Sequence, residues 1–317
     1  TEFHEKFHRK YRAKSPKFYL RLVKVHSTIV ELPTARSSRR AERRFTALNK
    51  RPIGVFDSGF GGLTAVRRLR GLMPREHIIY FGDTSRVPYG NRSRDTILKY
   101  AREDTRFLRT FGPKAIVIAC GTVSSNCLET LQEESDIPIT GVVEPAVHRA
   151  AALTKNRRVG VAATRATVSS GAFARVFRRI APEVEVISLP CPLFVPLVEE
   201  GRCRPGDVVI ETVAEEYLSP LRDRGVDTLV LGCTHYPLLT EVIARTMGEG
   251  VALVDVGAES ARACRDLLTA RGGLADREAG TSGYYTSDRA ENFQRLASLF
   301  LGEDAAGEVQ QIDLEQY

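Results

Sequence analysis

Short apolar runs alternate with amphipathic stretches from residue 51 onward, and this alternation constrains the fold more than any other feature. The runs that fit buried strands are 53–56, 78–81, 115–119, 139–143, 159–162, 184–189, 228–231 and 251–254. The stretches that fit helices include 63–72, 93–111, 172–179, 206–224 and 259–270. Strands that alternate with helices form parallel βαβ units, and strands buried on both faces are apolar throughout. The sequence therefore predicts an α/β fold whose parallel sheets carry helices on both faces.

This α/β region contains an internal repeat. Residues 53–58 (IGVFDS) resemble 159–164 (VGVAAT), and residues 115–122 (AIVIACGT) resemble 228–235 (TLVLGCTH). The second pair of segments places Cys120 and Cys233 directly after a strand. Ligands of open α/β sheets bind beyond the carboxyl ends of the strands. Two facing halves would therefore present both thiols to one crevice.

The positive charge of the chain is concentrated at its N-terminus. Residues 1–50 carry 14 Lys and Arg against 4 Asp and Glu, whereas the other 267 residues carry 32 against 35. We expect residues 1–50 to be a disordered basic extension. A nucleic-acid or anionic-membrane contact, a regulatory segment and a targeting peptide are the alternatives for this segment. The α/β region itself gives no charge argument for nucleic-acid binding.

Composition excludes several other classes of protein. The content of 43% hydrophobic and 27% charged residues is that of a globular protein. No apolar run approaches the ~20 residues that a membrane-spanning helix needs. Six cysteines in 317 residues are too few for a disulfide scaffold, and the spacings of zinc ribbons and zincins are missing. We therefore expect a cytoplasmic protein that binds no metal.

A matched pair of thiols has three chemical interpretations. A disulfide is one, although no redox motif marks it. A cysteine hydrolase that pairs Cys233 with His235 is another, but it needs one nucleophile rather than two. The third is proton transfer on both faces of one carbon, in which one thiolate removes a proton and the opposite thiol returns one. That reaction needs one ionised and one neutral thiol, and Asp57 and His235 lie at strand ends where they would differentiate the two.

Two loops after strands carry further polar residues. Residues 57–62 (DSGFGG) precede a helix, so they fit either a structural turn or a loop that receives an anion. Residues 82–90 (GDTSRVPYG) fit a turn at the end of the second strand, which Asp83 and Arg86 would brace. Glu199 directly follows the apolar stretch 194–198 (FVPLV).

Taken in order, these motifs are similar to those of the glutamate racemases, in the aspartate/glutamate racemase superfamily. The strongest matches are FDSGFGG (56–62), YFGDTSRVPYG (80–90) and LGCTHYPLL (231–239), supported by GVVEPA (141–146), ATVSSGAF (166–173) and FVPLVEEG (194–201). The resemblance runs from about residue 52 to the C-terminal region and leaves the basic extension outside. It implies an isomerase that interconverts L- and D-glutamate without a cofactor and supplies D-glutamate for peptidoglycan.

The resemblance also implies roles for individual residues. Cys120 is the implied base toward D-glutamate, and Cys233 is the implied base toward L-glutamate. Four side chains are implied as assisting acidic or basic groups: Asp57, His235, Asp83 and Glu199. The implied substrate contacts are Asp57, Ser58, Pro88, Tyr89, Gly90, Gly121, Thr122, Thr167, Thr234 and His235.

One position departs from the family pattern. The usual motif at the first cysteine is Cys-Asn-Thr, whereas this chain has Gly121 between Cys120 and Thr122. Losing a hydrogen bond to a charged group costs about 1.5–3 kcal/mol when nothing replaces it. Asn126 and an ordered water are the candidates to replace the missing amide.

The implied architecture is two similar flavodoxin-like, doubly wound parallel-sheet domains with the active site in the cleft between them. We expect a first domain of residues 51–140 and 255–317 and a second of residues 141–254, assembled as a homodimer. A superfamily racemase for aspartate or a hydantoin is one alternative. A non-catalytic role of the basic extension in binding anions or nucleic acid is another. Nothing in the α/β region indicates a contact with nucleic acid or with DNA gyrase.

Overall fold

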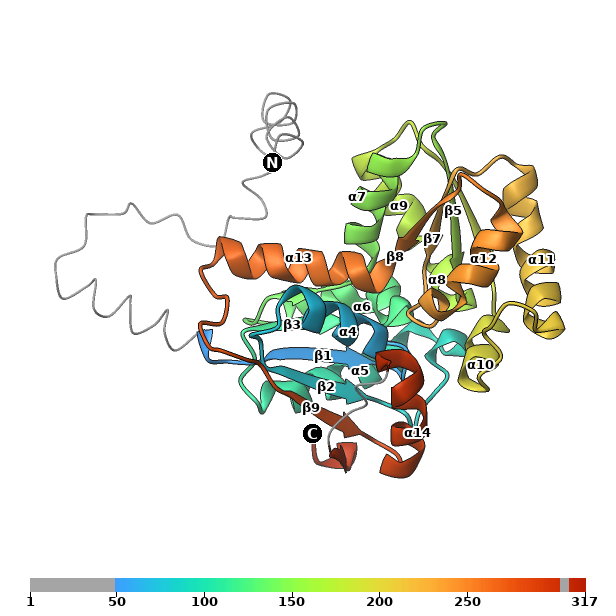
Figure 1. The fold of residues 1–317 in the computed structure, drawn as a ribbon. Helices are drawn as coiled ribbons and strands as arrows, with labels where there is room; N and C mark the ends of the chain where they lie inside the picture. The colour runs from blue at the N-terminus through green and yellow to red at the C-terminus, as the bar shows by residue number, and fades with distance from the viewer. Residues whose placement is uncertain (1–48, 303–307) are drawn as a thin grey trace, which may run out of the picture. The chain divides into compact units, whose positions relative to one another are not determined.

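Two parallel β-sheets form the framework of the chain, which the computed structural model describes for residues 49–302 and 308–317 (Figure 1). The first sheet has the order β10-β9-β2-β1-β3-β4, and the second has the order β6-β5-β7-β8. The strands are β1 Ile53–Asp57, β2 Ile78–Gly82, β3 Ala115–Ile118, β4 Ile139–Thr140, β5 Arg158–Ala163, β6 Glu185–Pro190, β7 Thr228–Leu231, β8 Ala252–Asp255, β9 Ser282–Thr286 and β10 Val309–Gln311. Both orders contain the second-first-third-fourth arrangement of flavodoxin-like sheets. The predicted fold class is therefore confirmed.

Helices cover both faces of each sheet. The α-helices are α4 Leu63–Leu72, α5 Arg94–Arg109, α6 Gly121–Glu133, α7 Val143–Leu153, α8 Arg165–Ser170, α9 Ala172–Ile180, α10 Phe194–Glu199, α11 Val208–Asp223, α12 Thr240–Met247, α13 Val256–Ala270 and α14 Ala290–Leu301. Short 3-10 helices are η1 Tyr89–Asn91, η2 Tyr236–Leu239 and η3 Leu314–Gln316. The first sheet lies between α5 and α6 on one face and α4, α13 and α14 on the other. The second lies between α7 and α9 on one face and α10, α11 and α12 on the other.

Successive residues of a strand serve different cores. In β1, Val55 packs on the side of α4 and α13, whereas Phe56 packs on the side of α5 and α6. Side chains alternate across a strand, so a run that is apolar throughout buries both faces of the sheet. Each such side chain stabilises the fold by roughly 1.5–3 kcal/mol relative to an exposed one. This two-sided burial is the reason why the apolar runs predict the central strands.

The internal repeat extends to the register of the strands. Ile53 pairs with Ala115 in the first sheet, and its counterpart Val159 pairs with Thr228 in the second. Each cysteine lies two residues beyond its strand, because β3 ends at residue 118 and β7 ends at residue 231. Both thiols are therefore at the carboxyl edge of a sheet, where α/β proteins bind their ligands.

The predicted helices correspond to α4, α5, α9, α11 and α13, with ends that differ by up to three residues. The strand predicted at 139–143 is shorter, because α7 begins at Val143 and has Pro145 in its first turn, where proline is tolerated. No apolar run predicts β9 or β10, since their sequences SGYYT and VQQ are short and rich in polar residues. β9 pairs with β2 and so brings the C-terminal segment into the first sheet.

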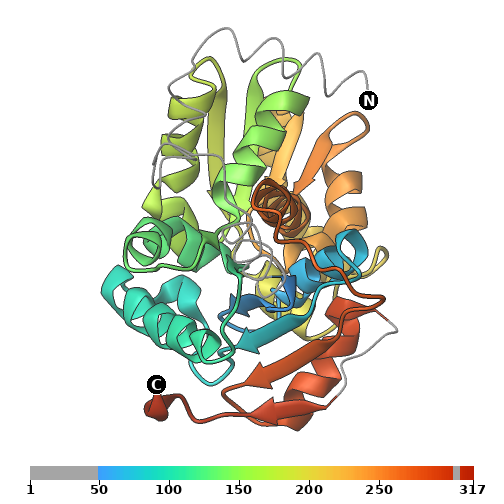
Figure 2. The ribbon, with the colours of Figure 1, turned by 90° about the vertical axis from the view of Figure 1, so that its left-hand side faces the viewer.

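The long helix α13 connects the two sheets. It packs against α4, which covers the first sheet, and against α7, which covers the second. Figure 2 shows it end-on between the sheets. The chain thus returns from β8 of the second sheet to β9 of the first through α13 and the segment 271–281.

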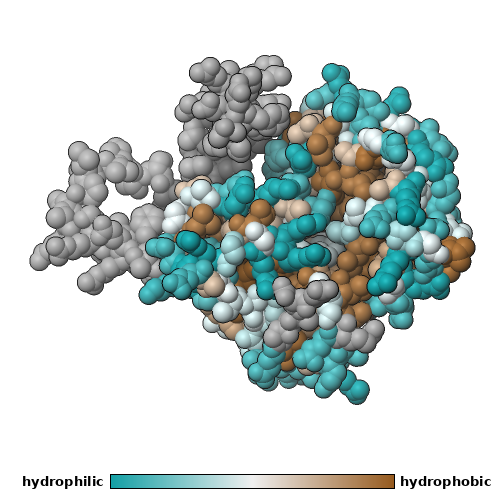
Figure 3. Space-filling model, viewed as in Figure 1, coloured by the Kyte–Doolittle hydropathy of each residue, from teal (hydrophilic) through white to brown (hydrophobic). Residues whose placement is uncertain are grey.

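The surface is mixed in character. On the face shown in Figure 3, hydrophilic residues separate the apolar patches, as is usual for folded proteins. Among the helices of residues 49–302 and 308–317, none is long and apolar enough to cross a membrane. Residues 1–48, which hold nearly all of the predicted basic extension, lie outside the described residues.

Candidate active site

A cavity of about 300 Å³ lies at the carboxyl ends of strands from both sheets. The predicted site residues that line it are Asp57, Ser58, Pro88, Tyr89, Gly90, Cys120, Gly121, Thr122, Glu199, Cys233, Thr234 and His235. Asp83 and Thr167 are the two predicted site residues that do not line it. Both thiols of the repeat therefore face the same small space, as two facing halves would require.

Cys120 enters the cavity from the first sheet. It follows β3 and is the residue that immediately precedes α6, with only 4% of its surface exposed. Its thiol donates a hydrogen bond to the Ser58 hydroxyl oxygen at 3.4 Å. Burial raises the pKa of the Cys120 thiol, and the nearby Asp57 carboxylate raises it further. Cys120 is therefore a protonated thiol at neutral pH.

Cys233 enters from the second sheet and has a different neighbour. Its sulfur lies 3.7 Å from His235 Nδ1, and His235 Nε2 lies 2.9 Å from Glu199 Oε1. Burial opposes the charged form of the imidazole, but the interactions with Cys233 and Glu199 outweigh it and raise the pKa of His235 to about 10. A protonated imidazole donates from both ring nitrogens. The Cys233 sulfur therefore accepts a hydrogen bond, whereas the Cys120 thiol donates one.

The loop after β1 holds a carboxylate and seats the histidine of the other half. Asp57 accepts a hydrogen bond from the Gly62 N–H at 2.9 Å, which fixes its carboxylate at the start of α4. A Cβ atom on Gly61 would collide with the His235 ring and the Thr234 hydroxyl, so only glycine leaves room for them. The glycines of DSGFGG therefore serve the contact between the two halves as well as the turn.

Gly121 also permits a close approach between the halves. A Cβ atom at this position would lie 2.5 Å from the Gly232 carbonyl oxygen, which is backbone and cannot turn aside. Asn126 does not take the place of the family asparagine, since its Nδ2 donates to the Thr122 carbonyl oxygen of its own helix at 2.8 Å. The departure from Cys-Asn-Thr thus accompanies a backbone contact between the two cysteine loops.

Asp83 and Thr167 lie behind the cavity wall. Asp83 is fully buried, and its oxygens contact Arg86, Tyr89 and Ser287. The Thr167 hydroxyl lies 3.0 Å from the Thr164 hydroxyl, which does line the cavity. Each of the two therefore contacts a residue that lines the cavity, Tyr89 for Asp83 and Thr164 for Thr167, without lining it itself.

Sequence reasoning missed several residues that line the cavity: Gly59, Val87, Asn91, Thr164, Arg165, Pro192, Val195 and Pro196. The repeat carried a signal for one of them, because Thr164 occupies the position that corresponds to Ser58. Its hydroxyl lies 3.1 Å from that of Thr122, so the two halves also meet through hydroxyl groups. The proline and valine residues carry no chemical signal and could not be found from residue type.

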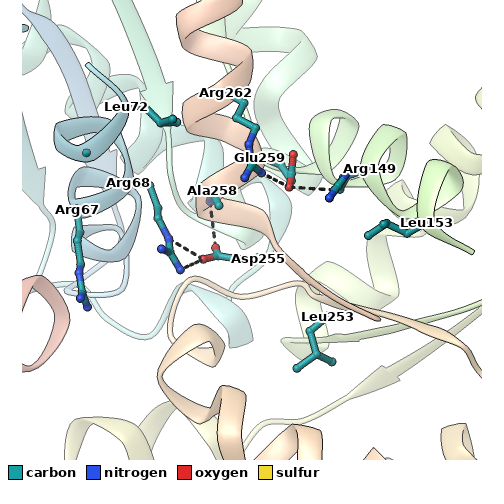
Figure 4. A pocket seen from close by; sticks show the side chains of 11 residues that line it. Arg67, Arg68, Leu72, Arg149, Leu153, Leu253, Asp255, Ala258, Glu259 and Arg262 are labelled. Carbon is teal, nitrogen blue, oxygen red and sulfur yellow. Dashed lines mark hydrogen bonds and ion pairs between the residues drawn. The ribbon is translucent and has the colours of Figure 1, made fainter. Parts of the chain in front are cut away.

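A second cavity of about 570 Å³ has a different character (Figure 4). Its walls come from α4, α7, β8 and α13, and three of its four arginines, Arg68, Arg149 and Arg262, pair with carboxylates. Arg68 lies 3.0 Å from Asp255, and Arg149 lies 3.7 Å from Glu259. No cysteine or histidine is among the described residues that line it. Among all the residues that the structure describes, no cluster of three or more His, Cys, Asp or Glu side chains could hold a metal ion.

Comparison with known proteins identifies the family of the chain. The family model described as Asp/Glu/Hydantoin racemase matches residues 64–264. The glutamate racemase of Geobacter metallireducens is 49% identical over 266 residues, which cover 83% of this chain and 97% of that protein. The chain is also similar to the crystal structure of glutamate racemase from Francisella tularensis in complex with D-glutamate, with a TM-score of 0.79 and 38% identity over 85% of this chain and 100% of the other.

A second solved structure supports the same relationship. The glutamate racemase of Thermus thermophilus, in complex with beta-chloro-D-alanine, has a TM-score of 0.76 and 42% identity over 85% of this chain and 99% of its own. The family model covers more than half of the 317 residues, and the relatives match over almost their whole length. The chain therefore belongs to the Asp/Glu/hydantoin racemase family, and within it to the glutamate racemases.

Proposed function

We propose that this chain interconverts L- and D-glutamate by removing and returning the α-proton with two thiols, those of Cys120 and Cys233. The observation that carries the proposal is that the two cysteines, from matching strand ends of two sheets, line one small cavity. The names of the similar racemases, and the D-glutamate in the Francisella structure, support glutamate as the substrate.

In the direction from L- to D-glutamate, Cys233 acts as the base. Its sulfur accepts a hydrogen bond from protonated His235, and it takes the α-proton of the substrate. Cys120 then gives its thiol proton to the opposite face of the same carbon. One proton leaves and one arrives, so the two sulfurs exchange protonation states and no cofactor enters the steps. In the reverse direction Cys120 is the base and Cys233 is the acid.

The cavity offers complementary charges to a zwitterionic dicarboxylate. Asp57 is the proposed partner of the ammonium group, and Arg165 and the hydroxyls of Thr122 and Thr234 are proposed partners of the carboxylates. The other predicted contacts that line the cavity are proposed to complete the site: Ser58, Pro88, Tyr89, Gly90, Gly121 and His235. Glu199 acts through His235, and Thr167 acts through Thr164. We assign Asp83 a positioning role, because it does not reach the cavity.

We also propose the organisation that the family resemblance implies. It comprises two domains, residues 51–140 with 255–317 and residues 141–254, and a cytoplasmic homodimer that supplies D-glutamate for peptidoglycan. The strands of the first sheet lie at 53–140 and 282–311, and those of the second lie at 158–255, which supports the division. Light scattering of the purified protein tests the dimer, with a mass of twice 35.1 kDa expected.

The first test is incubation of the purified protein with L-glutamate in D₂O, without added cofactor. Optical rotation and deuterium at the α-carbon are followed together. We expect the rotation to fall to zero as deuterium enters. If aspartate or a hydantoin reacts and glutamate does not, the substrate assignment is wrong.

The second test separates the two thiols. Cys120→Ser and Cys233→Ser should each abolish turnover, because each face of the carbon needs its own acid or base. The surviving thiol can still exchange the α-proton of one enantiomer. Cys264→Ser is the matched control, since that cysteine is buried in the core away from the cavity. Racemisation near the wild-type rate by both site variants would exclude the two-thiol mechanism.

A further inference from the structure

A cluster of buried charged groups lies directly behind one wall of the cavity. Residues 87–91 form this wall, and the ring of Tyr89 is 1% exposed. The Tyr89 hydroxyl is not directed at the substrate cavity but hydrogen-bonds to Asp83 in the preceding loop. It also lies 3.3 Å from Oδ2 of Asp104, which is on α5. The position of the wall therefore depends on groups that do not line the cavity.

One guanidinium serves three carboxylates in this cluster. Arg86 Nε lies 2.6 Å from Asp83, Arg86 Nη2 lies 3.1 Å from Asp104, and Arg86 also pairs with Glu103. Its guanidinium carbon lies 4.1 Å from the centre of the Tyr100 ring. Asp83 and Asp104 are both 0% exposed. Burying two negative charges in excess would be costly, so the cluster favours the retention of a proton.

Counting the donors identifies the carboxyl group that holds this proton. Asp83 Oδ1 accepts from the Ser287 hydroxyl at 2.7 Å, and Asp83 Oδ2 accepts from Arg86 and Tyr89. Asp104 Oδ1 accepts from Arg86, which leaves Oδ2 facing only the Tyr89 oxygen among the groups that the structure describes. A phenol has one proton, and here it is committed to Asp83. The Tyr89 oxygen can therefore form a hydrogen bond with Asp104 as well only if Asp104 carries the proton.

We propose that Asp104 keeps its proton at neutral pH and donates it to the Tyr89 oxygen, so that Asp104 is a positioning residue for the cavity wall. In the protonated cluster every oxygen of Asp83, Asp104 and Tyr89 has a partner. Loss of that proton would bring two ionised carboxylates against one phenol and would loosen the wall. Burial and the Asp83 charge both raise the pKa of Asp104, which agrees with the donor count.

The sign of the pH effect follows from the protonated form. At pH values below the pKa of Asp104 in the folded protein, the protonated carboxyl group fixes the wall. As the pH rises through that pKa, the proton is lost and the wall loosens. The other charged or titratable groups that face Asp104 are Asp83, Arg86 and Tyr89 from the loop after β2 and Glu103 from α5. The KM for glutamate should therefore rise by about tenfold at alkaline pH, while kcat changes less. This expectation rests on the proposed function.

Asp104→Asn is the informative variant. Its amide can donate to Tyr89 and accept from Arg86, but it has no proton to lose, so KM should stay constant where the wild-type KM rises. Glu103→Gln is the matched control, because it removes the neighbouring carboxylate that does not contact Tyr89. Its KM should still rise with pH, at a somewhat lower pH than in the wild type, since the Glu103 charge also raises the pKa of Asp104. Equal pH dependence of KM in the wild type and Asp104→Asn would overturn the proposal.

Infrared difference spectroscopy tests the proton without any turnover. The wild type at neutral pH should show the carbonyl band of a protonated carboxyl group, which Asp104→Asn lacks and Glu103→Gln retains. If the band is the same in the wild type and Asp104→Asn, the proposal is wrong, whether or not glutamate is racemised. A wild type that shows the band but does not racemise glutamate would contradict only the proposed function. Should Asp104→Asn fail to fold, Tyr89→Phe serves instead, and its removal of the acceptor should shift the band.

Discussion

At the scale of single residues, the charge of His235 bears directly on the Cys233 sulfur. It is held between the Cys233 sulfur and the Glu199 carboxylate, and these two groups overcome a burial that would otherwise favour the neutral ring. The proton stays on the ring until the pH approaches the raised pKa of about 10. Glu199 thus acts on the Cys233 sulfur indirectly, by keeping the His235 imidazole charged.

Replacement of Glu199 should move the alkaline limit of the reaction. In Glu199→Gln one of the two causes that raise the pKa of His235 is lost, so the alkaline limb of kcat/KM for L-glutamate should move to lower pH by about one unit or more. The measurement is a pH profile with L-glutamate as substrate. Glu200→Gln is the control, because Glu200 is the exposed neighbour of Glu199 and makes no contact with His235. An unchanged profile in Glu199→Gln would show that the pair does not govern the charge of the ring.

Gly121 should tolerate no side chain. The Cβ of Gly121→Ala would meet the Gly232 carbonyl oxygen at 2.5 Å, so the two cysteine loops must separate. We expect a loss of about 1–3 kcal/mol in stability and a fall of at least about tenfold in kcat/KM. Urea unfolding and steady-state kinetics measure the two effects. Gly71→Ala, where a Cβ meets nothing within 4 Å, should leave both unchanged or slightly improved.

At the scale of elements, α13 is the helix on which the joining of the two sheets depends. It packs on α4 and α7, and its first turn is capped by Asp255 at the end of β8. The Asp255 carboxylate accepts hydrogen bonds from the N–H groups of Gly257 and Ala258 at 2.9 and 3.0 Å. The same carboxylate pairs with Arg68 on α4 (Figure 4). One side chain thus begins the helix and links it to a neighbour.

The capping role predicts a specific order of stabilities. Asp255→Ala should lower the free energy of unfolding by about 1–2 kcal/mol, because two N–H groups lose their acceptor. Asp255→Asn should retain most of that stability, since the amide oxygen can still accept. Arg68→Gln removes only an ion pair whose arginine is 52% exposed, and it should cost less than about 1 kcal/mol. If Arg68→Gln costs as much as Asp255→Ala in urea unfolding, the ion pair rather than the cap is the stabilising contact.

At the scale of the whole molecule, the described lining of the cavity comes from segments of both sheets. Every described residue that lines the cavity falls between Asp57 and His235, and the strands of both sheets lie within 53–311. The body of the chain also carries a slight negative balance, with 32 Lys and Arg against 35 Asp and Glu in residues 51–317. We therefore expect chemistry in the cavity to proceed without the basic N-terminal segment.

Removal of residues 1–48 should leave racemisation intact. We expect kcat/KM for glutamate to stay within about twofold of the full chain, because the predicted site residues all lie between Asp57 and His235. A truncated protein that folds by circular dichroism but has lost activity would show that the N-terminal segment contributes to the site. The full-length chain, assayed in parallel at the same concentration, is the control.

The candidate site could be predicted in part because some of its residues follow strands that are recognisable locally. Cys120, Cys233 and Asp57 come just after buried apolar runs, and the repeat marked the positions of the two cysteines as equivalent. β9 and β10 gave no such signal, because their sequences SGYYT and VQQ are short and rich in polar residues. β10 is at the edge of the first sheet, and β9 lies between it and β2. Asp104 was also missed, since a carboxylate on an amphipathic helix resembles a solvated residue until its partners are known.

The sequence by itself determined the central strands, the helices between them and the placement of a thiol at each of two strand ends. These features depend on side chains within a few residues of one another, which alternate or recur with the period of a strand or helix. Only the tertiary structure decided that Glu199 of α10 meets His235, that Gly61 makes room for that ring, and that Asp104 of α5 lies against Tyr89. These contacts join segments that lie 15 to 174 positions apart. They form only when the two sheets fold and meet, because burial then brings groups together that no local pattern connects.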